Sequence, residues 1–391
     1  MKEIMIAIYL FIFKIFFSLF KLLPLKNKVT FLISFPENPV FIYKQMKLQK
    51  INAKPIFLCH LRCYDRFAKT NELTYLFETK NILHTVKGFY HLATSAHVIA
   101  DNYYGCLAVI KFKKEVQCLQ IWHAVGAIKQ FGIYDPANKF RHPKAIQRFK
   151  NVYAKFDKII VGSDKMGSIF KKAYLKDEDS ILKIGIPRTD FFFRKEQLQH
   201  VKNSFYQTNP IFKTKKIILY APTFRNNAGL GVDTALDIPL IYESLNGQYI
   251  LILKFHPSTT HINFSSKYSN FVYDYSNYPT INELLAITDI LITDYSSLPM
   301  EFSLLKRKMI FFAYDLEEYK NSSGFWEDYE ASVPGPIVKN TTELIDTILN
   351  QQVNIRQLET YAKKWTNYCD GNSSSRFVRT LLETKIPSKF F

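Results

Sequence analysis

A histidine that follows an apolar run is the first candidate for chemistry in this chain. His123 lies in the segment 120–132 (QIWHAVGAIKQFG), directly ahead of a turn that contains glycine. A histidine titrates near neutral pH, so at the exposed edge of a sheet it can take the proton from a sugar hydroxyl that attacks phosphorus. General base catalysis of this kind is worth about 10²- to 10⁴-fold in rate. A structural role for the same histidine is the alternative.

A second candidate is the turn 183–190 (KIGIPRTD), which places Arg188 and Asp190 after another apolar run. A guanidinium donates two parallel hydrogen bonds to a phosphate, which favours an anion-binding role for Arg188. An Arg–Asp pair that only closes the loop between two halves of the chain is an equal alternative.

Three further polar side chains follow two apolar runs of the second half. The segment 221–225 (APTFR) contributes Thr223 and Arg225, and the segment 254–257 (KFHP) contributes His256. Because the carboxyl ends of parallel strands share one edge of a sheet, we expect these three side chains to converge. Donors grouped in this way stabilise charge on a nucleotide diphosphate during phosphoryl transfer. The sequence therefore predicts a pyrophosphate site at this edge.

The segment 293–297 (TDYSS) follows the apolar run DILI and precedes a helical pattern. Ser296 and Ser297 are therefore candidates for the helix N-cap, where main-chain N–H groups and the helix dipole favour an anion. Glu301 falls in the first helical turns, where its carboxylate can accept hydrogen bonds from ribose hydroxyls. A serine followed by a glutamate is also a capping arrangement, which is the structural alternative.

The elements that must hold these residues are short apolar runs that alternate with helical patterns. In the first half of the chain the runs are 28–35, 53–58, 97–101 and 118–122. In the second half they are KIILYAP from Lys216, YILILKFHP, FVYDY and DILITDY. This alternation predicts a parallel sheet in each half, with ligands at the carboxyl ends of the strands.

Length and composition predict two globular domains. The chain has 391 residues, more than the roughly 100–200 of one domain. Apolar residues make up 47% and charged residues 22%, which excludes a disordered chain. A polar stretch at 194–214 marks the boundary. We therefore expect an α/β protein with domains at 26–200 and 201–391, the second ending in helices, and a separate helix at 1–25.

The net charge of +18 favours phosphorylated substrates or anionic lipid as partners. The basic residues are spread along the chain without a nucleic-acid-binding motif, so we expect no nucleic-acid partner. The cysteines are odd in number and favour a reducing cytosol over a disulfide framework: Cys59, Cys63, Cys106, Cys118 and Cys369. Cys59 and Cys63 flank His60, but four metal ligands are not assembled and a buried strand is favoured. Without a carboxylate cluster of DxD type, no metal and no cofactor are expected.

The N-terminal run from Ile4 to Phe20 is almost entirely apolar and is interrupted by Lys14. It is shorter than the ~20 clean apolar residues that cross a bilayer, and no small-residue cleavage site follows it. A helix that lies in the membrane interface, with lysines reaching the head groups, explains both the length and the charges. A true span and a buried core helix are the alternatives. Because the run contains no motif, we expect residues 1–25 to be dispensable for folding.

Taken in order, these segments resemble the CDP-glycerol glycerophosphotransferase family of teichoic acid synthesis. The similarity covers most of the chain, from Lys28 to the C-terminal helical region. KVTFLISF, ADNYYG, QIWHAVGAIKQFG, RFKNVYAKFDKIIVGSDKMGSIFKKAY and IGIPRTD look most like segments of the TagB/TarB-like glycerol-phosphate primases. The chain is also similar to these primases in length.

The resemblance implies a GT-B glycosyltransferase fold of two Rossmann-like domains, with the acceptor bound by the first and the donor by the second. It implies that His123 is the catalytic base and that His256 is a second essential histidine at the donor phosphates. The positions implied to bind the donor are Arg188, Thr223, Arg225, Ser296, Ser297 and Glu301. The polymerases typically carry His-Gly-Thr-Pro where this chain has His-Ala-Val-Gly. This departure favours a different acceptor and leaves the roles of Val125 and Gly126 open.

The implied reaction is a single displacement at the β-phosphorus of CDP-glycerol, with CMP as the leaving group. The implied acceptor is an undecaprenyl-diphosphate-linked N-acetylmannosaminyl-N-acetylglucosamine, and the implied location is the cytoplasmic face of the cell membrane of a Gram-positive bacterium, with peripheral attachment. The alternatives that stay open are a second-step transferase or polymerase, a CDP-ribitol donor, and a nonenzymatic membrane-bound polyanion-binding protein. The oligomeric state is also open, a homo-oligomer included.

Overall fold

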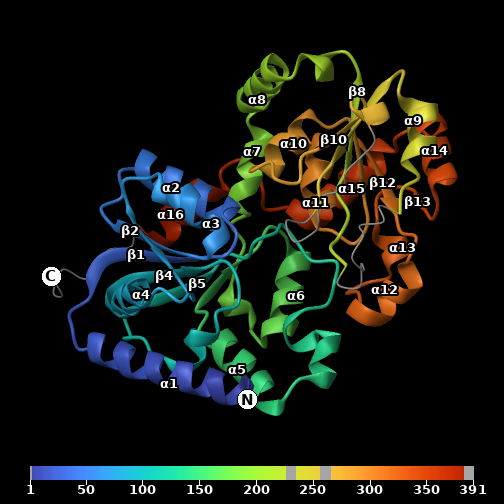
Figure 1. Ribbon diagram of the computed structural model, residues 1–391. Helices are drawn as coiled ribbons and strands as arrows, with labels where there is room; N and C mark the ends of the chain where they lie inside the picture. The colour runs from blue at the N-terminus through green and yellow to red at the C-terminus, as the bar shows by residue number, and fades with distance from the viewer. Residues whose placement is uncertain (1, 226–234, 256–265, 383–391) are drawn as a thin grey trace. The chain divides into compact units, whose positions relative to one another are not determined.

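The computed structural model describes residues 2–225, 235–255 and 266–382, which form an α/β protein with two parallel sheets (Figure 1). The first sheet has the order β3-β2-β1-β4-β5-β6-β7, and the second has the order β10-β9-β8-β11-β12-β13. Numbered from its own first strand, each sheet contains the order 3-2-1-4-5-6, which is that of the Rossmann fold. The prediction of an α/β fold with two parallel sheets is confirmed.

The strands are short, and their apolar side chains are largely buried. The first sheet contains β1 Lys26–Ile33, β2 Lys54–Cys59, β3 Leu73–Leu76, β4 Ser95–Ala100, β5 Gln117–Gln120, β6 Lys158–Ile160 and β7 Ile181–Leu182. The second contains β8 Lys216–Tyr220, β9 Tyr249–Leu253, β10 Val272–Asp274, β11 Ile290–Thr293, β12 Lys308–Phe312 and β13 Ile337–Val338. In both sheets the strand order reverses between the first and fourth strands, where such folds bind their ligands. These strands are β1 and β4 in one sheet and β8 and β11 in the other.

Helices connect the strands, as parallel pairing requires. Those of the first half are α1 Lys2–Phe20, α2 Glu37–Leu48, α3 Leu61–Ala68, α4 Ile82–Thr94, α5 Pro143–Tyr153, α6 Asp164–Tyr174, α7 Asp190–Phe193 and α8 Lys195–Thr208. Those of the second half are α9 Ile238–Leu245, α10 Ile281–Ile287, α11 Leu298–Phe302, α12 Leu316–Ser323, α13 Tyr329–Ser332, α14 Thr341–Asn350, α15 Ile355–Thr366 and α16 Ser373–Leu382.

The described chain divides into two compact units. The first comprises residues 2–125, 131–190 and 367–382, and the second comprises 126–130, 191–255 and 266–366 without the gap at 226–234. The boundary expected at 200/201 therefore falls inside α8, which belongs wholly to the second unit. The final helix α16, expected in the second domain, belongs to the first unit.

The first unit holds α16 through its N-terminus. The Asp190 carboxylate accepts the main-chain N–H groups of Ser373 and Ser374 at 2.8 and 2.9 Å. These are N–H groups that a helix leaves without partners of its own, so Asp190 acts as a cap contributed by a distant segment. Gly185 has a φ of +82°, and a Cβ there would overlap the Ser373 hydroxyl and lie 2.6 Å from the main-chain oxygen of Tyr368. This contact requires glycine at position 185.

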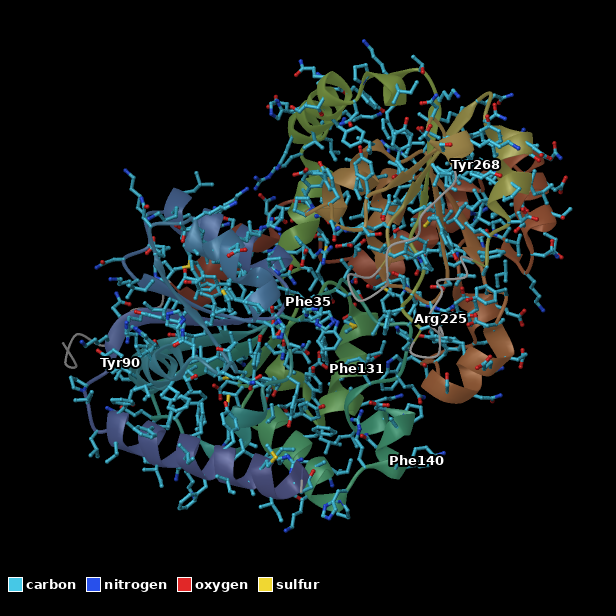
Figure 2. All side chains as sticks on the ribbon, in the orientation of Figure 1. Phe35, Tyr90, Phe131, Phe140, Arg225 and Tyr268 are labelled. Carbon is cyan, nitrogen blue, oxygen red and sulfur yellow. The ribbon has the colours of Figure 1, made fainter. Side chains whose placement is uncertain are left out.

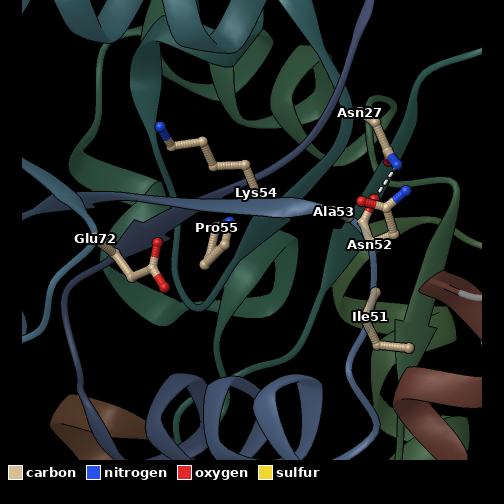
Figure 3. Close-up of a pocket in the computed structure, with 7 residues that line it drawn as sticks. All are labelled: Asn27, Ile51, Asn52, Ala53, Lys54, Pro55 and Glu72. Atoms are coloured by element: carbon tan, nitrogen blue, oxygen red, sulfur yellow. Dashed lines mark hydrogen bonds between the residues drawn. The ribbon is translucent and has the colours of Figure 1, made fainter.

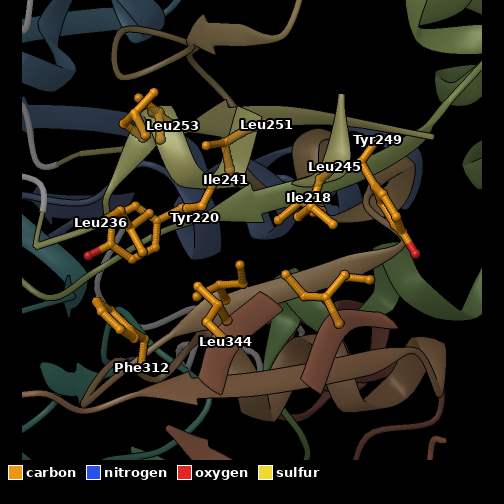
Figure 4. Packing of buried hydrophobic residues seen from close by; sticks show 14 of the residues in the cluster. Ile218, Tyr220, Leu236, Ile241, Leu245, Tyr249, Leu251, Leu253, Phe312 and Leu344 are labelled. Carbon is orange, nitrogen blue, oxygen red and sulfur yellow. The ribbon is translucent and has the colours of Figure 1, made fainter. Parts of the chain in front are cut away.

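One hydrophobic core of the second unit lies between its sheet and the helices α9 and α14 (Figure 4). Ile218 and Leu251 of the sheet are buried together with Ile241 of α9 and Leu344 of α14. Each fully buried aliphatic side chain of this kind stabilises the fold by about 1.5–3 kcal/mol. Because these side chains form the core, the residues that follow the strands can be polar without destabilising it.

The helix α1 packs along α4 in the first unit (Figure 1). Phe13 and Phe17 are buried, and the Phe13 ring meets Phe89 of α4 at a centroid distance of 4.3 Å. At its N-terminal end, Glu3 accepts a bidentate pair from Arg148 of α5, at 2.6 and 3.0 Å. The helix is long and apolar enough to cross a membrane, and 17% of its window 3–20 is buried. The expectation that residues 1–25 are dispensable for folding stays a prediction; their removal would take away the two buried rings and the ion pair to α5.

Candidate active site

His123 is presented by a main-chain turn just beyond β5. The preceding residue, Trp122, has a φ of +53° and donates its N–H to the Gln120 side-chain oxygen at 2.8 Å. A bulky residue with positive φ is strained, and such conformations are concentrated at functional sites. The turn therefore places His123 at the carboxyl edge of the first sheet, as the sequence predicted.

The His123 ring lies between two aromatic side chains. Its centroid is 4.1 Å from that of Phe35, with the planes 17° apart, and 4.2 Å from that of Trp122. Its Nδ1 atom is 3.2 Å from the main-chain oxygen of Asp101. A carbonyl oxygen only accepts, so Nδ1 carries the hydrogen in this contact. In the neutral ring the lone pair is then on Nε2, which is the nitrogen that can act as a base.

Arg188 supports the His123 turn from the first unit. It is 5% exposed, and its guanidinium donates to the main-chain oxygen of His123 at 3.0 Å. Its own N–H donates to the side chain of Asn38, which in turn donates to the main-chain oxygens of Ile121 and Trp122. The sequence analysis thus selected Arg188, which does lie beside His123. It did not select Asn38, whose only sequence feature is its place after β1.

In the second unit Thr223 and Arg225 are held together at the end of β8. The buried Asp294 carboxylate accepts the N–H of Thr223 and the guanidinium of Arg225, both at 2.8 Å. The Arg225 guanidinium also donates to both oxygens of Asp315, at 2.8 and 3.1 Å. Burial raises the pKa of Asp315, but the hydrogen bonds and charge of Arg225 outweigh it, so the pKa lies below its usual value. Neither aspartate was predicted, although Asp294 directly follows β11 and Asp315 comes shortly after β12.

Aromatic rings enclose this ion cluster. The Arg225 guanidinium lies 5.1 Å from the Tyr295 ring and 4.8 Å from the Tyr319 ring. These two rings stack on each other at 3.9 Å, and the Tyr295 hydroxyl donates to Asp315 at 2.9 Å. Arg225 is therefore a cation whose charge is balanced by two carboxylates and which is held in one orientation.

The serine segment begins α11, a helix of only five residues. Ser297 occupies the N-cap position, but its side chain makes no capping hydrogen bond. The Ser296 hydroxyl accepts the N–H of Leu298 at 3.2 Å. Glu301 lies in this helix and is 2% exposed. Ser296 and Ser297 thus lie at the start of a helix, as predicted. Glu301 is more deeply buried than we expect of a side chain that binds a ribose from solvent.

His256 lies outside the described residues, so its convergence with Thr223 and Arg225 stays a prediction. The chain is described up to Phe255. The Lys254 ammonium donates to the main-chain oxygens of Ser276 and Tyr278, at 2.6 and 2.9 Å. The strand end that leads to His256 is therefore anchored to the loop after β10.

A short segment after the His123 turn belongs to the second unit. A Cβ at Gly126 would come within 2.5 Å of Met300 and of Trp365, so only glycine fits. Lys129 forms an antiparallel bridge with Phe325, and its ammonium donates to the Tyr319 hydroxyl at 3.2 Å. Lys129 thus stands beside the Arg225 cluster. Lys129 belongs to the segment 120–132 that contains His123, but the sequence analysis indicated no role for it.

The described residues contain no group of three or more histidine, cysteine, aspartate or glutamate side chains that could hold a metal ion. Cys59 and Cys63, which flank His60, are both buried as free thiols. Burial raises the pKa of the Cys63 thiol to about 12, so it stays protonated at neutral pH. These cysteines pack in the first unit, as the buried-strand interpretation predicted.

A surface pocket of about 430 Å³ lies at the amino ends of β1 and β2, away from the carboxyl edge that holds His123 (Figure 3). Asn27 and Lys54 stand at the amino ends of these strands, and Glu72 directly precedes β3. Parallel sheets bind their ligands at the carboxyl ends. This pocket is therefore not a candidate for the active site.

Comparisons with known proteins agree with this geometry. A family model described as CDP-Glycerol:Poly(glycerophosphate) glycerophosphotransferase matches residues 15–383. The teichoic acid glycerol-phosphate primase of Bacillus subtilis (strain 168) is 35% identical over 356 residues, which cover 90% of this chain and 91% of the primase. The teichoic acid ribitol-phosphate primase of Bacillus spizizenii is 37% identical and covers 75% of this chain and 77% of its own.

Longer relatives and solved structures extend the comparison. The teichoic acid poly(ribitol-phosphate) polymerase of B. spizizenii is 32% identical over 94% of this chain, but only 58% of the polymerase is covered. The solved structure of the wall teichoic acid polymerase TagF aligns with a TM-score of 0.81 at 23% identity, over 94% of this chain and 92% of that one. This likeness shows the same fold. The family match spans most of the chain, and we conclude that it belongs to the CDP-glycerol:poly(glycerophosphate) glycerophosphotransferases, the transferases of teichoic acid biosynthesis.

Proposed function

We propose that this enzyme is a teichoic acid glycerol-phosphate primase. It transfers sn-glycerol 3-phosphate from CDP-glycerol to the N-acetylmannosamine of an undecaprenyl-diphosphate-linked disaccharide and releases CMP. The observation that carries the proposal is the oriented His123, whose Nδ1 donates to a carbonyl oxygen and leaves Nε2 to act as base. Similarity to a glycerol-phosphate primase over nine-tenths of both chains supports the primase step. Two sheets of Rossmann order support assignment of the fold to the GT-B class.

The proposed reaction is a single displacement. The Nε2 atom of His123 takes the proton of the acceptor hydroxyl, and the freed oxygen attacks the β-phosphorus of CDP-glycerol. The bond from that phosphorus to the bridging oxygen breaks, and CMP leaves with the electron pair. Charge on the transferring phosphoryl group has to be stabilised by fixed donors, which is the main task of the protein in such reactions.

We propose that the second unit supplies most of those donors. The candidates are Thr223, Arg225, His256, Ser296 and Ser297. The Arg225 guanidinium already donates to two carboxylates. Its main contribution to CDP-glycerol binding is therefore to hold the strand ends in fixed positions. Arg188, from the first unit, and Glu301 are proposed as further donor-binding residues.

A ribitol donor and a polymerising activity are the rival proposals. Ribitol-phosphate primase and polymerase relatives are as similar as the glycerol-phosphate primase. We expect incubation of the synthetic lipid disaccharide with CDP-glycerol to give a product heavier by one glycerol phosphate. A product formed only from CDP-ribitol, or a ladder of added units, supports a rival instead.

We further propose that the enzyme attaches peripherally to the cytoplasmic face of the membrane through α1. The face of α1 opposite α4 is apolar and exposed: Ile4, Met5, Ile8, Phe11, Ile12, Ile15 and Leu19. A spanning orientation would uncover Phe13 and Phe17 and separate Glu3 from Arg148, whereas an in-plane helix keeps both contacts. The docked helix therefore favours the interfacial arrangement.

A second exposed apolar point supports this orientation. Phe140, at the tip that precedes α5, is 92% exposed (Figure 2). Exposed basic side chains surround it in sequence: Lys139, Arg141 and Lys144. Arg148 joins the same helix α5 to the start of α1. An apolar tip among cations suits an anionic bilayer surface.

A further inference from the structure

The His123 ring is part of a continuous stack that begins with an arginine. The Arg62 guanidinium carbon lies 4.1 Å from the Phe35 ring centroid, and Phe35 stacks on His123 at 4.1 Å. His123 also meets Trp122 at 4.2 Å with the planes 32° apart, and Trp122 stacks on Phe131 at 4.7 Å. The imidazole therefore has two aromatic neighbours, which restrict its tilt.

Asp101 holds both His123 and the ring stacked on it. Its carboxylate accepts the Phe35 N–H at 2.7 Å and the Ser34 N–H at 2.8 Å. The Tyr104 hydroxyl donates to the same carboxylate at 2.9 Å. The main-chain oxygen of Asp101 meets Nδ1 of His123 at 3.2 Å. One fully buried residue thus sets the position of Phe35 and the hydrogen on Nδ1.

Arg62 holds the Phe35 turn from the other side. It lies in the first turn of α3, and its Nε donates to the main-chain oxygen of Ser34 at 2.7 Å. The same guanidinium covers the outer face of Phe35. A cation over a ring face is attracted by the ring's electrons, so Arg62 restrains the Phe35 ring that stacks on His123.

We propose that Phe35, with Asp101 and Arg62, positions His123 for proton abstraction and fixes its tautomer. The inference rests on the proposed role of His123 as the base. None of the three residues needs to touch the substrate. A residue in this role affects turnover through the orientation of Nε2 and leaves donor binding unchanged.

The first test separates positioning from stability. We expect Phe35→Leu and Arg62→Met to lower kcat by about 10- to 100-fold, since a misplaced group costs about this much. The KM for CDP-glycerol should stay within about twofold, because binding energy is not removed. Phe35→Tyr keeps the stacked ring and should retain most of the wild-type kcat.

Matched controls lie in the same unit. Phe149→Leu removes a half-buried ring of α5 outside the stack, and Arg66→Met changes a second arginine of α3. Both should retain wild-type kcat. Melting temperatures of all variants identify any that fail to fold. Wild-type kcat in folded Phe35→Leu overturns the inference.

The second test does not depend on activity. In full-length protein labelled with ¹⁵N-histidine, the ring nitrogens of neutral His123, assigned with His123→Gln, should report a hydrogen on Nδ1 alone. Phe35→Leu should show averaging between the two tautomers, and Phe149→Leu should not. A hydrogen on Nε2 in the wild type, or no change in Phe35→Leu, overturns the inference.

The two tests also separate this inference from the proposed function. If the wild type transfers glycerol phosphate and His123→Ala does not, the function stands whatever Phe35→Leu shows. If the wild type does not use CDP-glycerol, the proposed function fails, and the tautomer measurement still decides whether Phe35 fixes the ring.

Discussion

Two aspartates occupy equivalent places in the two units. Asp101 follows β4 and accepts main-chain N–H groups after β1, while Asp294 follows β11 and accepts the Thr223 N–H after β8. In each sheet these are the strands between which the order reverses. Each carboxylate therefore fixes the first strand end at the place where a Rossmann-type sheet binds its ligand.

The Asp101 carboxyl should make stability depend on pH. Burial raises its pKa to about 7, although the Phe35 N–H, the Tyr104 hydroxyl and the Ser34 N–H lower it. In the unfolded chain the pKa is about 3.9, so between about pH 4 and about pH 7 the folded state binds a proton that the unfolded state has lost. This contribution to stability is present at low pH and is lost as the pH rises toward 7.

Asp101→Asn lacks this titration. We expect the unfolding free energy of the wild type, minus that of the variant, to decrease as the pH rises across this window. Urea unfolding of both proteins at several pH values measures the difference. A difference that is constant or increases with pH contradicts the assignment.

Arg225 should be a large contributor to the stability of the second unit. Its removal leaves the buried Asp294 and the partly buried Asp315 without a cation, and breaking such a cluster costs about 3 kcal/mol. We expect Arg225→Ala to lose about this much in urea unfolding and to bind CDP-glycerol more weakly. The exposed Arg356→Ala should change stability by less than about 0.5 kcal/mol. Equal stability of the two variants would refute the role of Arg225 as the centre of the cluster.

At the scale of elements, the sequence predicts most strands that lie within apolar runs but misses β12, although four of its five residues are buried. β1, β2, β4 and β5 correspond to runs recognised in the first half, and β8, β9, β10 and β11 to those in the second. The unpredicted strands of the first sheet are short or half exposed: β3 lacks a buried residue, and β7 has only two residues. Their pairing depends on neighbouring strands, which no local pattern records.

Long-range contacts explain the remaining differences. The return of α16 to the first unit depends on Asp190, which caps the helix from 183 residues earlier in the chain. For the site, the sequence indicated His123, Arg188, Thr223 and Arg225 because they follow strands. It did not indicate the carboxylates that hold them, since an aspartate after a strand is also common in turns.

The segment 126–130 offers a test at this scale. A Cβ at Gly126 would overlap Met300 and Trp365, so Gly126→Ala should lose about 1–3 kcal/mol of stability through overpacking. Gly247 has no atom within 4 Å of the corresponding position, so Gly247→Ala should be neutral or slightly stabilising. Thermal unfolding of the two variants compares them directly. A Gly126→Ala variant as stable as Gly247→Ala would contradict the close packing of this segment.

At the scale of the whole molecule, the membrane proposal depends on the exposed face of α1. We expect the triple variant Ile8→Ser, Phe11→Ser and Ile15→Ser to float poorly with anionic vesicles, because the inserted apolar area is lost. High salt should release the wild type only in part, since burial of apolar side chains is not screened. The control is Leu349→Ser, Val353→Ser and Ile355→Ser, three exposed apolar residues of the second unit. Equal flotation of the two triple variants would refute anchoring by α1.

The central claim is that His123 is the base of a glycerol-phosphate transfer. The most direct measurement incubates wild type and His123→Ala with CDP-glycerol and the synthetic lipid disaccharide, and follows CMP release and product mass. The account predicts one glycerol phosphate added per CMP by the wild type, and a loss of at least about 10²-fold in His123→Ala, which should still unfold in a cooperative transition. Near-normal turnover by folded His123→Ala, or no transfer from CDP-glycerol by the wild type, would contradict it.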